Sequence, residues 1–170
     1  MRSFIVLFFG LLLLLECYVP AAHATSEAVQ LRIRFTGLRN AIGTIGMGIY
    51  RTQEEFETDK PFQTITLSKK GVKDGILLYS LHLAPSVYAI SVLDDENNNH
   101  QMDFNWMHIP KEGYGFSNYV HSGLVRPKVS KFQFRLQAPM EVDVKMQYWW
   151  TFSLSDEPFI MLSIARFIVW

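Results

Sequence analysis

The sequence of 170 residues is poor in cysteine, in net charge and in long apolar runs. Its one cysteine, Cys17, lies in an N-terminal apolar segment, so the rest of the chain has no disulfide, no thiolate nucleophile and no cysteine metal ligand. Basic and acidic residues number 16 each, and no basic block occurs. Because nucleic-acid binding requires clustered positive charge, we expect no nucleic-acid partner.

The N-terminal apolar run is too short to span a membrane as a helix, which takes about 20 residues. It follows a basic residue at position 2, covers Ile5 to Leu15 and precedes the small-x-small site Ala22-His23-Ala24. These are the parts of a secretory signal, so we predict a cleaved signal peptide over residues 1–24 and a periplasmic or secreted product. A lipoprotein signal is the alternative, but Glu16 stands before the cysteine, where such signals have a small residue.

No helical period long enough for an α/β fold is present, and apolar and polar residues alternate instead. The alternation runs from Val29 to Phe35 and returns at 45–49, 132–136 and 142–148. Such a period of two marks half-buried strands. Further strands are expected at 62–68, 76–83 and 87–93, and the segment 76–83, apolar on both faces, has the pattern of a central strand.

About seven short strands separated by turn signals predict an all-β, antiparallel sandwich over residues 25–148. An Ig-like or transthyretin-like arrangement is expected, and a closed barrel is the competing architecture. Thr52 followed by Glu55 predicts a short capped helix that ends at Pro61. The glycines at 43, 46 and 48 leave room for a close layer or a bulge.

The segment Asp94 to Asn118 is about 25 residues long, and loops of this length in small domains are usually functional or disordered. Its many aromatic residues favour an ordered, packed loop. Oxygen-bearing side chains recur at relative positions 1, 3, 5, 7 and 9, the spacing of a D-x-N-x-N calcium loop. The predicted metal ligands are Asp95, Asn97, Asn99, Gln101 (through its carbonyl) and Asp103.

Two residues depart from the full calcium motif. His100 stands where glycine makes the sharp turn, and Trp106 stands where a bidentate glutamate closes the site. We therefore expect at most weak Ca²⁺ binding, with a dissociation constant of about 10⁻⁴ to 10⁻³ M. The competing interpretation is that these side chains only build turns by accepting nearby backbone N–H groups.

Enzymatic chemistry has little support in the sequence. His100, His108 and Asp103 could ligate a transition metal or act as acid and base, but their spacing is not that of one helix face. Ser117 and His121 lack a G-x-S-x-G elbow, so a role in a turn is expected for the serine.

The loop combines D-x-N-x-N-x-x-x-D with I-P-K-E-G-Y-G-F-S-N, and it is preceded by L-A-P-S-V-Y-A-I-S-V-L-D-D-E-N. Over residues 30–148 the chain thereby resembles the bacterial exported family catalogued as domain of unknown function 2141. The resemblance implies a secreted or periplasmic β-sandwich, similar in layout to transthyretin-like or carboxypeptidase regulatory modules, with no established activity. The chain departs from the family pattern at His100 and Ser86, where the family has glycine, and its tail from Trp149 is not covered.

Gly113 and Gly115 permit positive φ values, so that the loop can fold back across the end of the sandwich. Its aromatic residues are expected to pack as a lid or to line a shallow pocket suited to a carbohydrate or a peptide. The candidate binding-surface residues are Trp106, His108, Lys111, Glu112, Tyr114, Phe116 and Asn118.

The tail from Trp149 to Trp170 is of uncertain structure. Phe159 to Trp170 is almost wholly apolar yet too short to cross a bilayer as a helix. An extension that covers the sandwich is one interpretation, and a membrane-associated or partner-binding segment is another. Taken together, the sequence predicts an exported binding or structural module of the cell envelope with Ca²⁺ as its one candidate cofactor. An envelope hydrolase using loop His and Asp residues is the alternative.

Overall fold

The computed structural model describes residues 27–106, 109–121 and 125–149. The predicted signal peptide over 1–24 and the tail after Trp149 lie outside the described residues.

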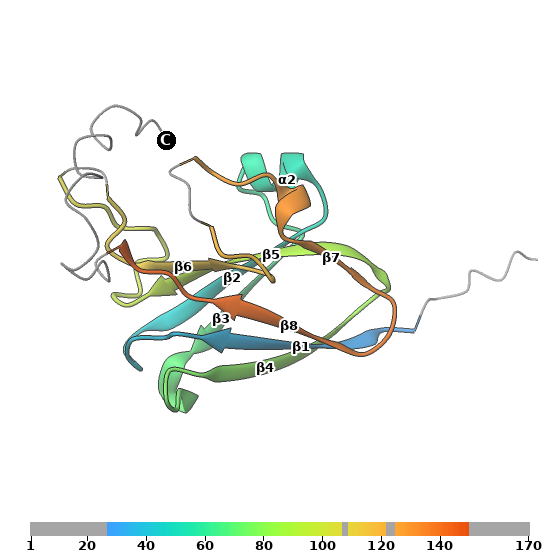
Figure 1. The fold of residues 1–170 in the computed structure, drawn as a ribbon, viewed down its shortest axis with the longest axis horizontal. Helices are drawn as coiled ribbons and strands as arrows, with labels where there is room; N and C mark the ends of the chain where they lie inside the picture. Colours follow the sequence, from blue (N-terminus) through green and yellow to red (C-terminus); the bar gives the residue numbers. More distant parts are fainter. Residues whose placement is uncertain (1–26, 107–108, 122–124, 150–170) are drawn as a thin grey trace, which may run out of the picture.

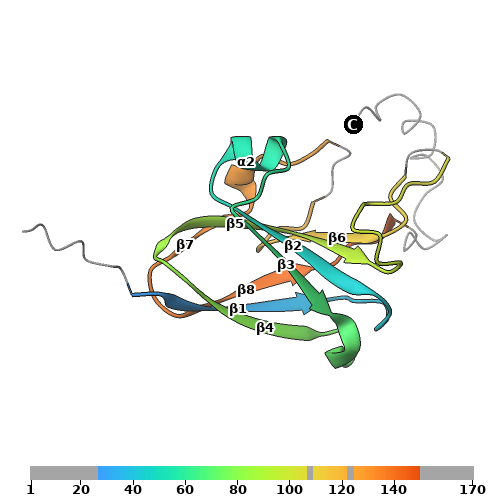
Figure 2. The ribbon, with the colours of Figure 1, turned by 180° about the vertical axis from the view of Figure 1, so that it is seen from behind.

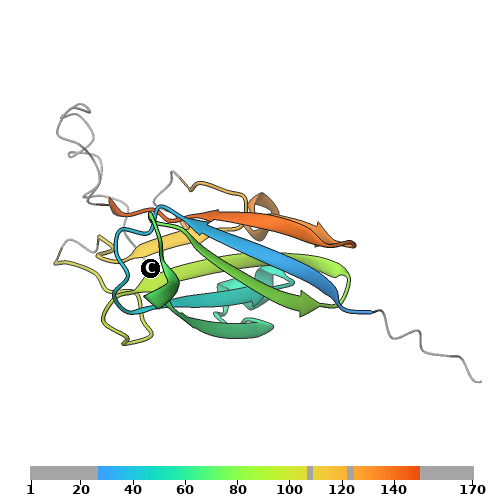
Figure 3. The ribbon, with the colours of Figure 1, turned by 90° about the horizontal axis from the view of Figure 1, so that it is seen from below.

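In the described residues, eight strands form two sheets that pack face to face (Figures 1 and 3). The three-stranded sheet has the order β4-β1-β8, made of β1 (Val29–Thr36), β4 (Leu77–Leu83) and β8 (Met140–Lys145). The five-stranded sheet consists of β2 (Thr44–Tyr50), β3 (Gln63–Ser68), β5 (Ser86–Asp95), β6 (Gly113–Phe116) and β7 (Gln133–Leu136). Its strand order is β3-β2-β5-β6, and β7 is also paired to β5. The predicted all-β sandwich is confirmed, and the sheets do not close into a barrel.

The pairing of β1 differs from the predicted antiparallel arrangement. β1 is antiparallel to β4 but parallel to β8, with Leu31 opposite Met140 and Phe35 opposite Val144. Parallel neighbours need a long connection between them, and here the whole of the intervening domain supplies it.

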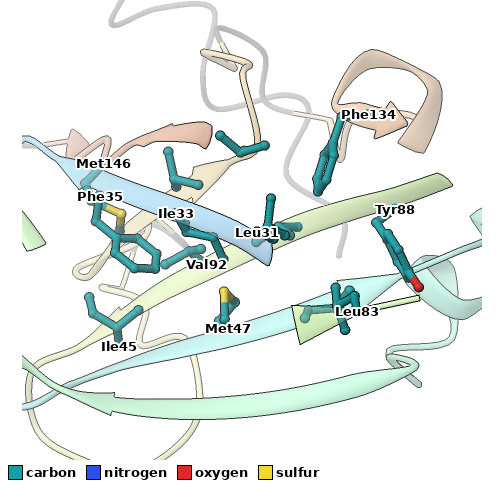
Figure 4. Packing of buried hydrophobic residues seen from close by; sticks show 14 of the residues in the cluster. Leu31, Ile33, Phe35, Ile45, Met47, Leu83, Tyr88, Val92, Phe134 and Met146 are labelled. Atoms are coloured by element: carbon teal, nitrogen blue, oxygen red, sulfur yellow. The ribbon is translucent and has the colours of Figure 1, made fainter. Parts of the chain in front are cut away.

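The core lies between the sheets (Figure 4). The alternating residues Leu31, Ile33 and Phe35 of β1 are fully buried, as the period of two predicts. They face the buried side chains of β2 and β5, among them Met47 and Val92.

The segment 76–83 was expected to be a central strand, but β4 is the edge of its sheet. Its side chains alternate between half-buried and exposed, and Leu78 is 58% exposed. In the segment 76–83, the presence of apolar residues on both faces accompanies an edge strand and not a central one. Burial of one face alone accounts for the strand, and exposed single leucines are ordinary on protein surfaces.

The expected capped helix is present as α2 (Gln53–Glu57), and the Thr52 side chain accepts a hydrogen bond from the Glu55 amide at 3.1 Å. Two short 3₁₀ helices, η1 (Lys69–Gly71) and η2 (Val129–Lys131), complete the fold. α2 lies on the face of the five-stranded sheet that points away from β1, β4 and β8 (Figures 1 and 2). There it forms a second core of six buried residues: Tyr50, Phe56, Ala89, Phe116, Val129 and Phe132.

Candidate functional site

Asp95, the last residue of β5, organises the first turn of the long loop. Its side chain is almost fully buried. One carboxylate oxygen accepts the Asn99 amide at 3.1 Å and the other accepts the His100 amide at 3.0 Å. Both oxygens therefore take part in backbone turns, as the turn-building interpretation expects.

Asn97, Asn99 and Asp103 come together one turn further along. The two asparagine amides donate to Asp103, at 2.6 Å from Asn97 and 3.1 Å from Asn99. Their carbonyl oxygens accept the amides of Asn99 and Gln101 respectively. Gln101, predicted to bind through its backbone carbonyl, is exposed and lies at the edge of the groove. The loop thus gathers four of the five predicted ligands around one turn.

The backbone makes the sharp turn without glycine. His100 has φ of +61° and Asn98 has φ of +59°, both in the left-handed region. Asparagine and histidine enter this region more readily than most residues, so the strain is small. The backbone at position 100 therefore takes the left-handed conformation without a glycine.

Glu112 was a candidate surface residue, but it is only 4% exposed. Its carboxylate accepts the Glu96 amide at 3.1 Å and the Asp103 amide at 3.2 Å, so it joins the two ends of the loop. Burial raises the pKa of Glu112, and the nearby Asp103 and Asp95 charges act in the same direction against the two backbone hydrogen bonds. Glu112 therefore has a structural role, and it lies close to Asp103 and the other oxygen-bearing side chains of the turn.

In the part of the chain that the structure describes, no group of three or more His, Cys, Asp or Glu side chains is arranged to hold a metal ion. The oxygens that converge are carboxylate and amide oxygens, which are the ligands that Ca²⁺ prefers. The side-chain oxygens of Asp95, Asn97, Asn99 and Asp103 nonetheless each accept a protein N–H group. Ca²⁺ binding at this turn stays a prediction.

A buried ionic network lies beneath the loop. Lys69 and Asp94 are both fully buried and form an ion pair at 2.5 Å. Lys69 also donates to Asn40 at 2.9 Å, while the Tyr148 hydroxyl donates to the other Asp94 oxygen. Burial, followed by the hydrogen bond to Asp94, raises the pKa of Tyr148 far above its ordinary value, so this donor is neutral at physiological pH.

A second layer of charge joins this network to the loop. Arg39 lies over the Tyr148 ring at 4.6 Å and forms an ion pair with Glu96 at 2.6 Å. That side-chain hydrogen bond lowers the pKa of Glu96, with help from Asn40 and against the effect of burial. The base of the loop is thus held by paired charges.

The outer face of the five-stranded sheet carries a groove of about 650 Å³. Strand register places Gly46 beside Leu93 and Thr66, and Gly48 beside Ser91, so the floor consists mostly of small residues. A Cβ at Gly46 would make only ordinary contacts with Leu93, whereas at Gly48 it would meet the Tyr50 ring at 2.6 Å. The open space above the sheet therefore lies at Gly46, whereas the Tyr50 side chain fills the space at Gly48.

Two groups of apolar side chains wall the groove. On one side lie Phe56 of α2, its partner Tyr50 at 5.2 Å between ring centroids, and Arg126, which stacks on Phe56 at 4.1 Å. On the other side the long loop and the end of the described chain contribute Met102, Phe104, Ile109, Pro110, Tyr114 and Trp149. Figures 1 and 2 show α2 and the loop rising from the same face of the sheet.

Only some of the candidate binding-surface residues lie at the groove. Tyr114 and Phe116 line the groove from β6, although Phe116 is mainly part of the second core. Trp106 is 87% exposed and does not line the groove, and His108 lies outside the described residues. Lys111 is exposed, and its carbonyl accepts from Arg39.

Asn118 is exposed and has a structural role, because it exchanges hydrogen bonds with Asp143 of β8. Ser117 is buried, and its hydroxyl accepts the Ile90 amide and donates to the Phe132 carbonyl, so it joins distant segments and does not cap the local turn expected from the sequence. Gly113 and Gly115 do not have positive φ. They lie in β6, where a Cβ would overlap the side chains of Tyr148 and Val144.

A shallow pocket lined by aromatic residues of the loop was expected from the sequence, but the strand floor of the groove and the ionic network were not, although some signals were present. Asp94 shares the inner face of β5 with Ile90 and Val92, so the period of two places a carboxylate in the core. A buried carboxylate requires a partner. Nothing in the Lys69-Lys70-Gly71 sequence, however, indicates that the first lysine supplies it.

The family model described as an uncharacterized protein conserved in bacteria, domain of unknown function 2141, matches residues 33–144. The chain belongs to this family. No curated protein and no solved structure matches it.

The family match covers the groove floor, the long loop and Lys69 and Asp94 of the ionic network. It ends before Tyr148 and Trp149, and therefore before one wall residue of the groove and the segment that follows it. Among the helices in the described part of the chain, none is long and apolar enough to cross a membrane.

Proposed function

We propose that this protein is an exported binding module of the bacterial cell envelope that holds an extended, apolar peptide segment in the groove. The observation that carries the proposal is the groove itself, an open and mostly apolar concavity above a floor of small residues. Ligand sites are typically concavities of about 300 to 1,000 Å³ with apolar and aromatic walls.

The shape of the groove suits a peptide in particular. β3 is the edge strand of the five-stranded sheet, and its Thr64 and Thr66 line the groove. An extended segment that lies there can pair with edge-strand backbone groups while its apolar side chains pack among the aromatic walls. A carbohydrate is the second ligand class, because aromatic rings beside hydroxyl groups also suit sugar rings.

The arrangement of the titratable residues favours binding over catalysis. The His100 side chain is 70% exposed and lies 3.4 Å from Asp95, whose oxygens already accept two backbone amides. An enzyme would need its histidines and carboxylates to converge on a shared cleft. Asp95 and His100 do line the groove, as do Asp59 and His121, but both Asp95 oxygens accept backbone amides and so hold the turn in place.

The test is peptide binding by the full chain and by Gly46→Phe, which places a ring on the groove floor. Gly46 has no left-handed conformation to preserve, and its Cβ fits, so the variant is expected to fold. Peptides selected from a random phage-displayed library on the full chain would be labelled and titrated by fluorescence anisotropy. We expect Gly46→Phe to weaken binding about tenfold or more, a loss equivalent to about 1.4 kcal/mol.

The matched control is Leu78→Phe, which adds a ring to the exposed face of β4 on the other sheet. It should leave the affinity within about twofold, since surface changes remote from a site are nearly neutral. Equal affinity of Gly46→Phe and the parent chain would reject the groove as the site. Displacement of every selected peptide by soluble oligosaccharides would favour the carbohydrate ligand.

A further inference from the structure

The described chain ends at a wall of the groove. Trp149 lines the groove, and its side chain forms a hydrogen bond with Tyr114 of β6. Burial raises the pKa of Tyr114, and the bond to Trp149 opposes this shift without cancelling it. The segment that follows Trp149 therefore starts beside an apolar concavity.

The following segment has the composition of an occupant. Phe159 to Trp170, F-I-M-L-S-I-A-R-F-I-V-W, contains apolar residues except at Ser163 and Arg166. Both this segment and the groove expose apolar surface when they are apart, and joining them removes that surface from water at about 25 cal/mol per Å². The 21 residues after Trp149 thus carry an apolar ligand of the kind the groove fits.

The tail has to cover only a short distance to cross the groove floor. The floor from β6 to β3 crosses three strand intervals, which is about 15 Å at about 4.8 Å each. Five extended residues cover that distance at about 3.3 Å each. Residues 150–158 are therefore a sufficient connection, and the tether raises the effective concentration of the apolar segment at the groove to about the millimolar range. Docking then requires only weak intrinsic affinity.

We propose that residues 159–170 dock in the groove of their own chain and compete there with the external ligand. This inference rests on the proposed function for the competition, but the docking itself needs only the groove. External peptides bind when their affinity exceeds that of the tethered segment, so the tail sets a threshold for occupancy. The tail is thus an internal competitor.

The experiment is disulfide trapping in the full chain. Cys17 is replaced by serine, so that introduced cysteines are the only ones present. One cysteine replaces Thr66, an exposed residue of the groove margin. The other replaces Ile160, Ile164 or Ile168 in turn, because three positions sample the length of the segment. Mild oxidation followed by non-reducing electrophoresis and peptide mapping measures the intramolecular disulfide.

The control pair moves the first cysteine to Ser80, an exposed residue of β4 on the opposite sheet. We expect at least one Thr66 pair to close about tenfold faster than its Ser80 counterpart, and Gly46→Phe to abolish that advantage. Equal rates for the Thr66 and Ser80 pairs at all three tail positions would overturn the proposal. Disulfide-linked dimers would also overturn it, because they would place the tail in the groove of a second copy.

Peptide titration separates the two proposals. Ile164→Asp in the full chain should raise the affinity for selected peptides about threefold or more if the tail competes. Trapping without peptide binding would reject the proposed function and keep the docking. Peptide binding sensitive to Gly46→Phe, with no trapping, would reject the docking and keep the proposed function.

Discussion

The two faces of the five-stranded sheet differ in the side-chain volume that each strand places on them. On the inner face β2 presents Ile45, Met47 and Ile49, all fully buried in the main core. On the outer face the same strand presents Gly46, which lies under the open groove, and Gly48, against which the Tyr50 side chain packs. Adjacent residues of one strand therefore serve opposite purposes: one face specifies the fold and the other keeps a surface open.

The largest effect is expected from Lys69→Met, which removes the cation of the buried Lys69–Asp94 ion pair on the inner face. Asp94 would be left as a buried carboxylate without its cation. Removing one partner of a buried ion pair typically costs about 3–5 kcal/mol. Urea unfolding followed by tryptophan fluorescence measures this loss. Lys70→Met is the control, since Lys70 is exposed and its replacement should change stability by less than about 0.5 kcal/mol. Similar losses for both lysines would argue against the buried pair.

The adjacent residues Met47 and Gly46 test the comparison directly. Met47→Ala opens a cavity in the core and should reduce the free energy of unfolding by about 2–5 kcal/mol. Gly46→Ala adds a methyl group to open space and should increase it by about 0.5–1 kcal/mol, because glycine weakens a strand. Both values come from denaturant titration of the full chain. If Gly46→Ala proved as damaging as Met47→Ala, the outer face would have to be packed.

A smaller effect than those of Lys69→Met and Met47→Ala is expected at the loop that forms one wall of the groove. If its oxygen cluster binds Ca²⁺ with a dissociation constant of about 1 mM, addition of 10 mM Ca²⁺ stabilises the native state by about 1.4 kcal/mol. Thermal unfolding with Ca²⁺ or with chelator measures the shift. Asp103→Asn removes one charge at nearly the same shape and should abolish it, whereas Asp143→Asn on β8 should not. No response of the parent chain would leave Asp95, Asn97 and Asn99 as turn formers alone.

The strands were largely predictable from the sequence because their alternation directly reflects which face is buried. β1 and β8 follow this rule residue by residue, as in Leu31, Ile33 and Val142. β4 was misplaced because its outward Leu78, with Ile76 just before the strand, imitates the second buried face of a central strand. Alternation reports burial on a face and carries no information on the number of neighbouring strands.

The site was less predictable, because it depends on contacts between distant segments. Asp95 and Asn99 were recognisable as turn residues from local spacing alone. The short strand β6 was hidden in the loop, since four residues with two glycines carry too little pattern to mark a strand. The groove arises where α2, β6 and the loop meet above Gly46, and no local sequence signal encodes that meeting.

The parallel pairing of β1 and β8 has a mechanical consequence. β1 begins at one end of the sandwich and β8 finishes at the other, as Figure 1 shows. A pull on the two ends of the domain would draw these neighbouring strands past each other along their length. All of their backbone hydrogen bonds would then bear the load at once and could not open one after another. If the domain were stretched between two attachment points, it would resist extension through this one pair of strands.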